Sequence, residues 1–412
     1  MHRFSLLTTI PVLSVALLAA LLTPTCTQMP AAPAPQVAPI FRQAVDPASN
    51  PRLLEMVAEY DRYFADQMAA TGTPGAAMVI VKDSQVVFER GYGLRAVGAP
   101  DSVDANTVFR IGSLSKGFAG VLSGILVAQG TLAWEEPVQQ LVPEFRLRDR
   151  GQTGRIKLWH LLSHTTGLPY HAYTHLIEQG YDIPTLMQKR FPLVPLAWKE
   201  GGTYSYQNAV FCVVEQMMQA ATGQTYQALL NEKIFRPAKM RTASCDYASI
   251  CGTQDKALPH YPIRGGWRAD NITSNFYNAT AAGGVNASIA DMGEWLQVLL
   301  GQRPEVVPNA ILDQVFHPVV KTDRERRIFP GWIGKDEASY ALGWRVLEHG
   351  GDTILYHSGS VNGFRAEIAL NRRDGIAVCM LFNACTPLGR ECVPAFFERW
   401  NDARTAVLDW QP

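Results

Sequence analysis

The residues with the clearest chemical potential stand together in the stretch RIGSLSKGF, which runs from Arg110 to Phe118. Ser113 precedes Lys116 by three positions, so on a helix both side chains lie on one face. A serine hydroxyl is a weak nucleophile until a neighbouring group accepts its proton. Lysine can accept it only when burial or a nearby positive charge lowers its pKa from about 10.4 towards neutrality. The spacing is that of a serine nucleophile with a lysine base.

Ser113 also has a simpler interpretation, because serine is a favoured N-cap residue and an apolar segment follows it. An S-x-x-K pattern is expected about once by chance in a chain of this length, so the pattern alone decides little. His164 and His175 could suggest a serine–histidine pair instead, but the chain has no G-x-S-x-G nucleophile elbow. The surroundings of Ser113 must therefore decide between nucleophile and cap.

Four further blocks with candidate functional residues follow Ser113. They are IKLWHLLSHTTGLP (156–169), EGGTYSYQNAVFCVVEQ (200–216), AAGGVNASIADMGEWLQVLL (281–300) and YHSGSVNGFRAEIAL (356–370). Together with FRIGSLSKGF, and in this order, they resemble the penicillin-recognising serine hydrolases, specifically the class C β-lactamase-like branch, over most of residues 75–385. That branch contains β-lactamases, D-Ala-D-Ala and D-amino-acid peptidases, and esterases. The resemblance implies an α+β fold of the β-lactamase/transpeptidase type.

The resemblance assigns roles to the first two motifs. Ser113 would be the acylated nucleophile, and Lys116 and Tyr206 would share the general-base work. A tyrosine, with a pKa near 10, needs adjacent cations to act as a base, and Lys116 would supply one. Asn208 would orient Lys116 and the amide of the substrate. Without the family context, Tyr206 would be a half-buried aromatic residue and Asn208 a turn or cap residue.

The third motif of the family, His-x-Gly here, occurs twice. We choose His357-Ser358-Gly359 over His349-Gly350-Gly351, because Gly363-Phe364 and a strand pattern follow it as in family members. Gly359 would let the backbone approach the substrate closely. The backbone amides of Ser113 and Ser360 would form the oxyanion hole, where each donor contributes about 3 kcal/mol in related chemistry.

The third motif departs from true class C β-lactamases, which carry Lys-Thr-Gly there. His357 is largely neutral at pH 7 and would donate a hydrogen bond to the substrate with less charge than lysine. Arg365 could recognise a substrate carboxylate, or could simply be a solvated strand residue. We therefore expect a serine hydrolase that acts through an acyl-enzyme on small esters, amides or β-lactam-like substrates.

Two alternative functions stay open. The first is a class C-type β-lactamase, a D-Ala-D-Ala carboxypeptidase or a D-amino-acid peptidase. The second is a penicillin-binding protein of the cell envelope that does not hydrolyse its ligand. The resemblance implies neither a metal nor an organic cofactor, and the expected partner is a small-molecule substrate.

Composition supports a folded enzyme and argues against a nucleic-acid partner. Of the 412 residues, 47% are hydrophobic and 18% are charged, which is ample material for a packed core. Lys plus Arg and Asp plus Glu both number 37, so the chain lacks the basic surplus of nucleic-acid-binding proteins.

The secondary-structure signals place strands at both ends of the folded part. Hairpins are predicted at 77–89 and 364–382, each with β-rich runs around a polar turn. Helices are predicted at 53–70 and 393–408. We expect one domain over 41–412, with an antiparallel sheet from 41–112 and 340–412, terminal helices beside it, and an inserted, mostly helical lobe at about 120–335.

The N-terminus has a different composition. No residue from Phe4 to Leu22 is charged, which predicts a signal peptide over 1–26 and an exported, periplasmic or secreted protein. An uncleaved membrane anchor and lipidation at Cys26 are alternatives that would attach the protein to a membrane. The Pro/Ala-rich stretch 27–40 is predicted to be an extended linker.

The other cysteines could pair only if the chain is exported. Cys245/Cys251 and Cys385/Cys392 are close enough in sequence to close small loops. Cys212 and Cys379 lie in apolar runs and are expected to be buried. No cysteine spacing resembles a zinc site.

Overall fold

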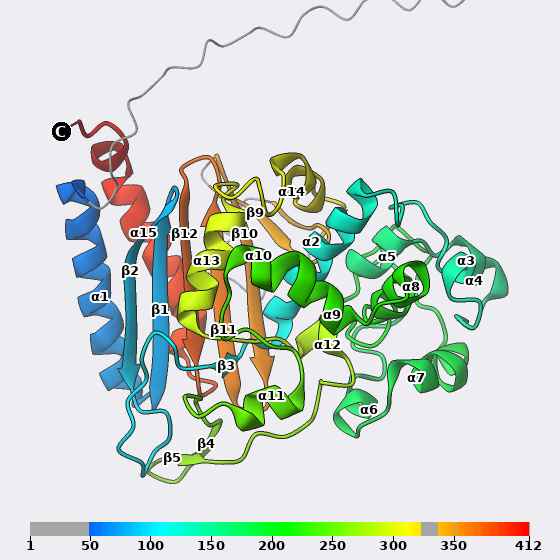
Figure 1. Ribbon diagram of the computed structural model, residues 1–412, viewed down its shortest axis with the longest axis horizontal. Helices are drawn as coiled ribbons and strands as arrows, with labels where there is room; N and C mark the ends of the chain where they lie inside the picture. Colours follow the sequence, from blue (N-terminus) through cyan, green and yellow to red (C-terminus); the bar gives the residue numbers. More distant parts are fainter. Residues whose placement is uncertain (1–48, 323–336, 350, 412) are drawn as a thin grey trace, which may run out of the picture. The chain divides into compact units, whose positions relative to one another are not determined.

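Two long helices from opposite ends of the folded chain lie side by side (Figure 1). The computed structural model describes residues 49–322, 337–349 and 351–411. Helix α1 (Pro51–Thr71) begins where the side chain of Asn50 accepts hydrogen bonds from two backbone amides, and it ends at Gly72 in a left-handed conformation. Its buried residues recur at helical spacing, so one face is apolar and packs inward. Helix α15 (Leu388–Leu408) packs beside it.

An eight-stranded antiparallel sheet lies against these helices (Figure 1). The sheet joins the first and last strands of the folded part, because β1 and its hairpin partner β2 are attached to β12 through pairs from Ala76↔Phe382 to Lys82↔Ile376. Both hairpins predicted from the sequence are present. The strands, in spatial order, are β2 (Gln85–Gly93), β1 (Gly75–Lys82), β12 (Ile376–Phe382), β11 (Phe364–Asn371), β10 (Asp352–Val361), β9 (Arg345–His349), β8 (Ala338–Tyr340) and β7 (Val320–Lys321).

The central strands are buried on both faces. In β1, Ala77 and Val79 belong to the core shared with the helical lobe, whereas Met78 and Ile80 belong to the core under α1 and α15. Successive strand residues point to opposite faces, so a strand covered on both sides must be apolar throughout. Cys379 in β12 is fully buried in the lobe-side core, as the sequence predicts.

The middle of the chain forms the predicted helical lobe on the other face of the sheet. Helix α13 returns from the lobe to pack on β1 and β12. Two small sheets pair β3 (Phe109–Arg110) with β6 (Asn286–Ala287) and β4 (His260–Ile263) with β5 (Gly266–Ala269). The helices are α2 (Ser115–Ala128), α3 (Val138–Leu141), α4 (Arg150–Arg155), α5 (Leu158–Leu162), α6 (Thr174–Glu178), α7 (Ile183–Lys189), α8 (Val213–Thr222), α9 (Tyr226–Leu230), α10 (Arg236–Ala238), α11 (Tyr247–Gly252), α12 (Thr280–Gly283), α13 (Ile289–Leu299) and α14 (Asn309–Val315), with short turns η2 (Gly112–Leu114), η3 (Phe191–Leu193) and η4 (Asn231–Phe235).

The α+β architecture expected from the sequence is thus confirmed, with differences at the edges. Helix α15 begins at Leu388, five residues before the predicted start, so that Pro394 lies inside it. The short strand β7 forms within the range assigned to the helical lobe. The predicted signal peptide and linker lie outside the described residues. Within the described part of the chain, no helix is both long and apolar enough to cross a membrane.

The two cysteine pairs suggested by the sequence are not disulfides in the structure. The six cysteines within the described ranges are free thiols. Each suggested pair joins one buried and one exposed residue: Cys245 and Cys392 are buried, and Cys251 and Cys385 are exposed. The predicted burial of Cys212 is confirmed.

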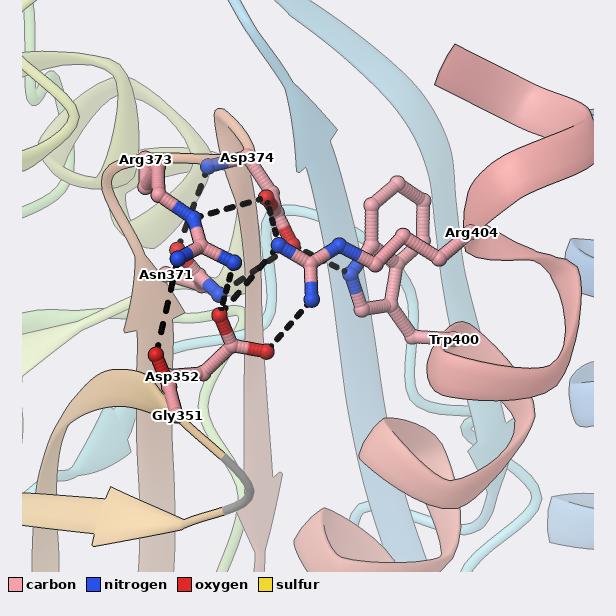
Figure 2. A network of polar contacts seen from close by, with 7 residues as sticks. All are labelled: Gly351, Asp352, Asn371, Arg373, Asp374, Trp400 and Arg404. Carbon is pink, nitrogen blue, oxygen red and sulfur yellow. Dashed lines mark hydrogen bonds and ion pairs between the residues drawn. The ribbon is translucent and has the colours of Figure 1, made fainter. Parts of the chain in front are cut away.

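A network of charged residues fastens the end of α15 to the sheet (Figure 2). Arg404 donates to Asp352 at 2.5 Å and to Asp374 at 2.6 Å. Trp400 Nε1 also donates to Asp374, at 3.0 Å. Both carboxylates are nearly inaccessible to solvent, with side chains 9% and 2% exposed. A buried carboxylate needs donors to compensate for lost hydration, so the network depends on Arg404.

Arg404→Met should therefore destabilise the protein. We expect the free energy of unfolding to fall by about 1–3 kcal/mol, because Asp374 would keep its burial but lose a charged donor. Urea unfolding followed by tryptophan fluorescence measures this. Arg390→Met is the matched control, since Arg390 is an exposed residue of the same helix and should change stability by at most about 0.5 kcal/mol. Equal losses in the two variants would contradict the role of the network.

Candidate active site

Ser113 lies in a tight turn and not at a helix cap. The turn η2 separates β3 from α2, and α2 begins at Ser115 without a side-chain cap. The neighbouring Ser115 satisfies the local backbone, because its hydroxyl donates to Gly112 O at 2.7 Å and accepts from Val285 N at 3.0 Å. The Ser113 side chain is partly exposed and lies 3.3 Å from Lys116 Nζ. The N-cap interpretation is therefore wrong.

Lys116 is completely buried below Ser113. Besides Ser113 Oγ, its amine has two oxygen neighbours: Asn208 Oδ1 at 2.8 Å and the carbonyl of Ala282 at 2.9 Å. Burial lowers the pKa of Lys116 to about 7, because the charged ammonium loses hydration, and the positive charge of Arg345 lowers it further. An amine poised near neutrality can carry or release a proton at working pH.

The elements around Lys116 explain why its oxygen neighbours stay in place. Asn208 follows Tyr206 by two residues in the segment before α8, and its Nδ2 donates to Thr174 Oγ1 at 3.4 Å. Ala282 belongs to α12, where Glu215 Oε1 accepts the adjacent amide of Ala281 at 2.7 Å. Burial raises the pKa of Glu215 to about 7. Three separate segments of the lobe therefore converge on one amine.

Tyr206 stacks over the same amine. Its ring centroid lies 4.7 Å from Lys116 Nζ and 5.6 Å from the guanidinium carbon of Arg345. Tyr206 is 6% exposed, so these contacts are largely shielded from water. The structure thus brings Ser113, Lys116, Tyr206 and Asn208 together as the sequence predicts.

Two glycines allow the edge of β10 to touch the Ser113 turn. A Cβ on Gly359 would lie 2.0 Å from Ile111 O and 3.1 Å from Ser113 N, which no other residue could accommodate. From the other side, a Cβ on Gly112, whose φ is +52°, would lie 2.8 Å from Ser360 N. The backbone amides of Ser113 and Ser360 therefore both lie where the edge of β10 contacts the turn that carries Ser113.

The choice between the two His-x-Gly motifs agrees with this contact. His357-Ser358-Gly359 lies on β10 beside the Ser113 turn. His349 ends β9 and pairs with Asp352 at the far end of the β9–β10 hairpin. Gly350 lies outside the described residues.

The expected role of the His357 side chain needs correction. His357 is 0% exposed, and both of its ring nitrogens are engaged inside the protein, with Tyr340 Oη at 3.0 Å and Ser358 O at 2.9 Å. Burial and the nearby charges of Arg345 and Lys116 hold its pKa well below the usual value, so the ring is neutral. No N–H remains to donate to a substrate carboxylate.

Arg365 also differs from expectation. Its Nε donates to Glu367 Oε1 at 2.7 Å, and its side chain packs against Gly389 of α15. Residues alternate along β11, so Phe364 and Ala366 face the lobe while Arg365 faces the terminal helices. Burial raises the pKa of Glu367 to about 7, and Arg365 opposes that shift. Arg365 thus forms an ion pair with Glu367 on the face of the sheet opposite Ser113. It does not recognise a substrate carboxylate.

The sequence interpretation assigned no role to three residues of this region. Arg345 and Tyr340 come from the stretch SYALGWRV, which contains no recognised motif, and His164 was considered only as a possible histidine partner of the serine. Ala282 lies in the glycine-rich block 281–300, and the resemblance of that block was the one indication that its carbonyl belongs to the site. Among the described residues, no group of three or more His, Cys, Asp or Glu side chains is placed to hold a metal ion.

The comparisons with known proteins agree with this geometry. The family model described as Beta-lactamase matches residues 60–397. The chain belongs to the Beta-lactamase family. This family is one of β-lactamase-fold serine hydrolases, and the match includes every residue of the site described above.

Relatives within the Beta-lactamase family are distant in sequence. Unguisins hydrolase ungD of Aspergillus violaceofuscus (strain CBS 115571) is 26% identical over 342 residues, which is 76% of this chain and 58% of that protein. Protein flp of Staphylococcus aureus (strain MW2) is 24% identical over 336 residues, 80% of this chain and 62% of that protein. The chain thus spans less than two thirds of the length of these relatives.

A solved structure gives the same fold. The octameric penicillin-binding protein homologue from Pyrococcus abyssi is similar with a TM-score of 0.72 at 22% sequence identity. The similarity covers 85% of this chain and 77% of that one. The β-lactamase/transpeptidase-like fold is thereby confirmed.

Arg345→Gln should raise the pKa of Lys116 above its value of about 7, because removing a nearby positive charge favours the protonated amine. The neutral fraction of Lys116 at pH 7 would then fall. Titration of the lysine 13Cε resonances measures the pKa, and Lys116→Met identifies the signal. Arg345→Lys is the matched control, because it retains the charge. An unchanged Lys116 pKa in Arg345→Gln would show that Arg345 does not act on this amine.

Proposed function

We propose that the protein hydrolyses small esters and amides through an acyl-enzyme on Ser113, with Lys116 as the proton acceptor. One observation carries this proposal: the buried Lys116 amine lies 3.3 Å from the Ser113 hydroxyl, and within the described part of the chain it has two other oxygen neighbours, Asn208 Oδ1 and Ala282 O. In this arrangement the amine can serve as a base.

The argument follows from counting hydrogens. A neutral amine has two N–H bonds and one lone pair. The carbonyl oxygens of Asn208 and Ala282 can only accept, so they use both N–H bonds. The lone pair is then left for the Ser113 hydroxyl, which donates to it. With a pKa of about 7, Lys116 is neutral in a large fraction of molecules at neutral pH.

The proposed reaction has two stages. Ser113 Oγ attacks the substrate carbonyl carbon while its proton passes to Lys116 Nζ, and the amides of Ser113 and Ser360 hold the developing oxyanion. The proton then passes to the leaving group through Lys116 or Tyr206, and the bond to the leaving group breaks. Lys116 and Arg345 place positive charge beside the Tyr206 ring, the arrangement a phenol needs to exchange a proton. In the second stage a water molecule attacks the acyl carbonyl carbon and gives a proton to Lys116 Nζ. The bond from that carbon to Ser113 Oγ then breaks, the acid leaves, and the proton passes from Lys116 to Ser113 Oγ.

The preferred substrates are inferred from the charges around Ser113. His357 and Arg365, the two residues expected to recognise a carboxylate, are both engaged inside the protein. Substrates without a carboxylate near the reacting carbonyl do not need such a contact, so its absence does not lower their kcat/KM. The name of the relative unguisins hydrolase also supports a hydrolytic function. β-Lactamase or D-amino-acid peptidase activity, and penicillin binding without turnover, are the alternatives.

A fluorophosphonate probe should label Ser113. The modified peptide is identified by mass spectrometry, and Ser113→Ala should abolish labelling. Lys116→Met keeps the hydroxyl but removes its base, and general-base catalysis contributes about 10²–10⁴-fold, so its labelling rate should fall by that order. Circular dichroism confirms that both variants fold. An adduct at another residue that persists in Ser113→Ala would contradict the assignment.

Matched aryl esters test the substrate preference. The two esters share one short acyl group and differ only by a carboxylate on the leaving group. Because a charge-assisted hydrogen bond is about twice as strong as a neutral one, an enzyme with a carboxylate anchor would prefer the acidic ester by roughly one to two powers of ten in kcat/KM. We expect no such preference here, and slow turnover or stable acylation with penicillins. A tenfold or larger preference for the acidic ester would contradict the proposal.

A further inference from the structure

Three buried side chains from distant parts of the sequence form a continuous hydrogen-bonded chain behind Ser113. Tyr340 Oη lies 3.2 Å from His164 Nε2 and 3.0 Å from His357 Nε2. All three residues are 0% exposed. They come from the loop after α5, from β8 and from β10, so the chain crosses from the helical lobe to the sheet.

The two ends of this chain, together with neutral histidine rings, fix the direction of the bonds in it. At one end, the amide of Gln207 donates to His164 Nδ1 at 3.2 Å, so that nitrogen carries no proton. At the other end, His357 Nδ1 faces Ser358 O at 2.9 Å, and a carbonyl can only accept, so that nitrogen carries one. His164 Nε2–H then donates to Tyr340 Oη, whose own hydrogen goes to His357 Nε2. A hydroxyl can accept and donate at once, so all bonds are satisfied.

This chain makes the two histidines different tautomers. His164 carries its proton on Nε2, and His357 carries its proton on Nδ1. A second proton on His164 would point at the Gln207 amide, which is itself a donor. A second proton on His357 would occupy Nε2, which could then no longer accept the hydrogen of the Tyr340 hydroxyl. Burial holds the pKa of both histidines well below its usual value, which agrees with the neutral rings.

The lobe end of the chain holds the backbone on both sides of Tyr206. His164 accepts the amide of Gln207 through its ring and the amide of Ser205 through its carbonyl, at 2.9 Å. His164 makes both bonds while its backbone adopts a left-handed conformation, with a φ of 60°. A residue other than glycine in this conformation carries a steric cost that the surrounding bonds must offset.

The sheet end holds the strand that touches Ser113. His357 lies two residues before Gly359, whose backbone contacts Ile111 and Ser113. Its ring is fixed by Tyr340 on one side and by Ser358 O on the other. The chain therefore joins the Tyr206 segment to the strand edge that would supply the Ser360 amide.

We propose that the Tyr340 hydroxyl is a one-way hydrogen-bond bridge that sets the tautomers of His164 and His357 and so positions Tyr206 relative to the strand edge at Gly359. Tyr340 is a positioning residue, because the chain ends at Ser358 O and does not include Ser113. The effect on catalysis rests on the proposed function, whereas the tautomers can be measured independently of any activity.

Nuclear magnetic resonance tests the bridge directly. Long-range 15N–1H correlation spectra of the full chain labelled with 15N-histidine distinguish Nδ1–H, Nε2–H and doubly protonated rings. His164→Asn and His357→Asn identify the two signals. We expect an Nε2–H ring for His164 and an Nδ1–H ring for His357, neither titrating between pH 5 and 8, whereas the histidines of the urea-unfolded chain titrate near 6.5. An Nε2–H or doubly protonated His357 at pH 7 would overturn the proposal.

Tyr340→Phe tests the consequence for acylation. It removes the bridging hydroxyl and keeps the ring. A small misplacement of reacting groups can reduce the rate by up to about 10²-fold, so we expect the acylation rate constant to fall roughly 10- to 100-fold with little change in substrate affinity. His357 should also lose its fixed tautomer in this variant. Tyr204→Phe is the matched control, because it removes a hydroxyl from the same aromatic cluster but outside the chain.

The outcomes separate the two proposals. Unchanged acylation and an unchanged His357 tautomer in Tyr340→Phe would overturn the bridge. Equal rate losses in Tyr340→Phe and Tyr204→Phe would also overturn it, because they would reflect loosening of the whole cluster. A wild-type protein that is never acylated at Ser113 would overturn the proposed function, while the tautomers would still decide whether the bridge exists.

Discussion

The burial of one amine constrains much of this structure. Lys116 has no exposed surface, and a buried lysine is tolerated only where acceptors replace its lost water. Two acceptors come from the segment before α8 and from α12, and the turn before α2 adds the Ser113 hydroxyl. Each segment must be fixed by its own contacts, such as the Glu215 bond to the Ala281 amide. The helical lobe can thus be understood as the support that brings three oxygens to one nitrogen.

Much of the fold could be predicted from the sequence because its central strands carry strong local signals. β1 and β12 are apolar runs bounded by polar turns, and both are present where expected. The ends of elements were less predictable. Pro394 favours a helix that starts beside it, since proline is tolerated in a first turn, yet α15 begins six residues earlier at Leu388 and packs on α1. β7 has two residues, too few for any periodic pattern, and exists because β8 pairs with it.

The candidate site was predictable to different degrees. Helical spacing predicts that Ser113 and Lys116 lie together, and the resemblance assigns the roles of both residues and of Tyr206, Asn208 and Gly359. The error at Arg365 was avoidable, because the alternation in FRAEIAL places Arg365 and Glu367 on the face opposite Phe364. The surroundings of His357 were not predictable, since Tyr340 lies in no recognised motif and meets His357 only through the pairing of β8, β9 and β10.

The pairing of β1 with β12 has a consequence for biosynthesis. Lys82 and Ile376 are neighbours in the sheet but lie at opposite ends of the folded chain. At roughly 5–20 residues per second, about 15–60 s of translation separates the two strands. Throughout that time β1 has β2 on one side and an open, apolar edge on the other, which is a template for incorrect pairing. A ribosome-bound chain cannot close this sheet before most of β12 has emerged, so the nascent protein must be shielded or kept unfolded until then.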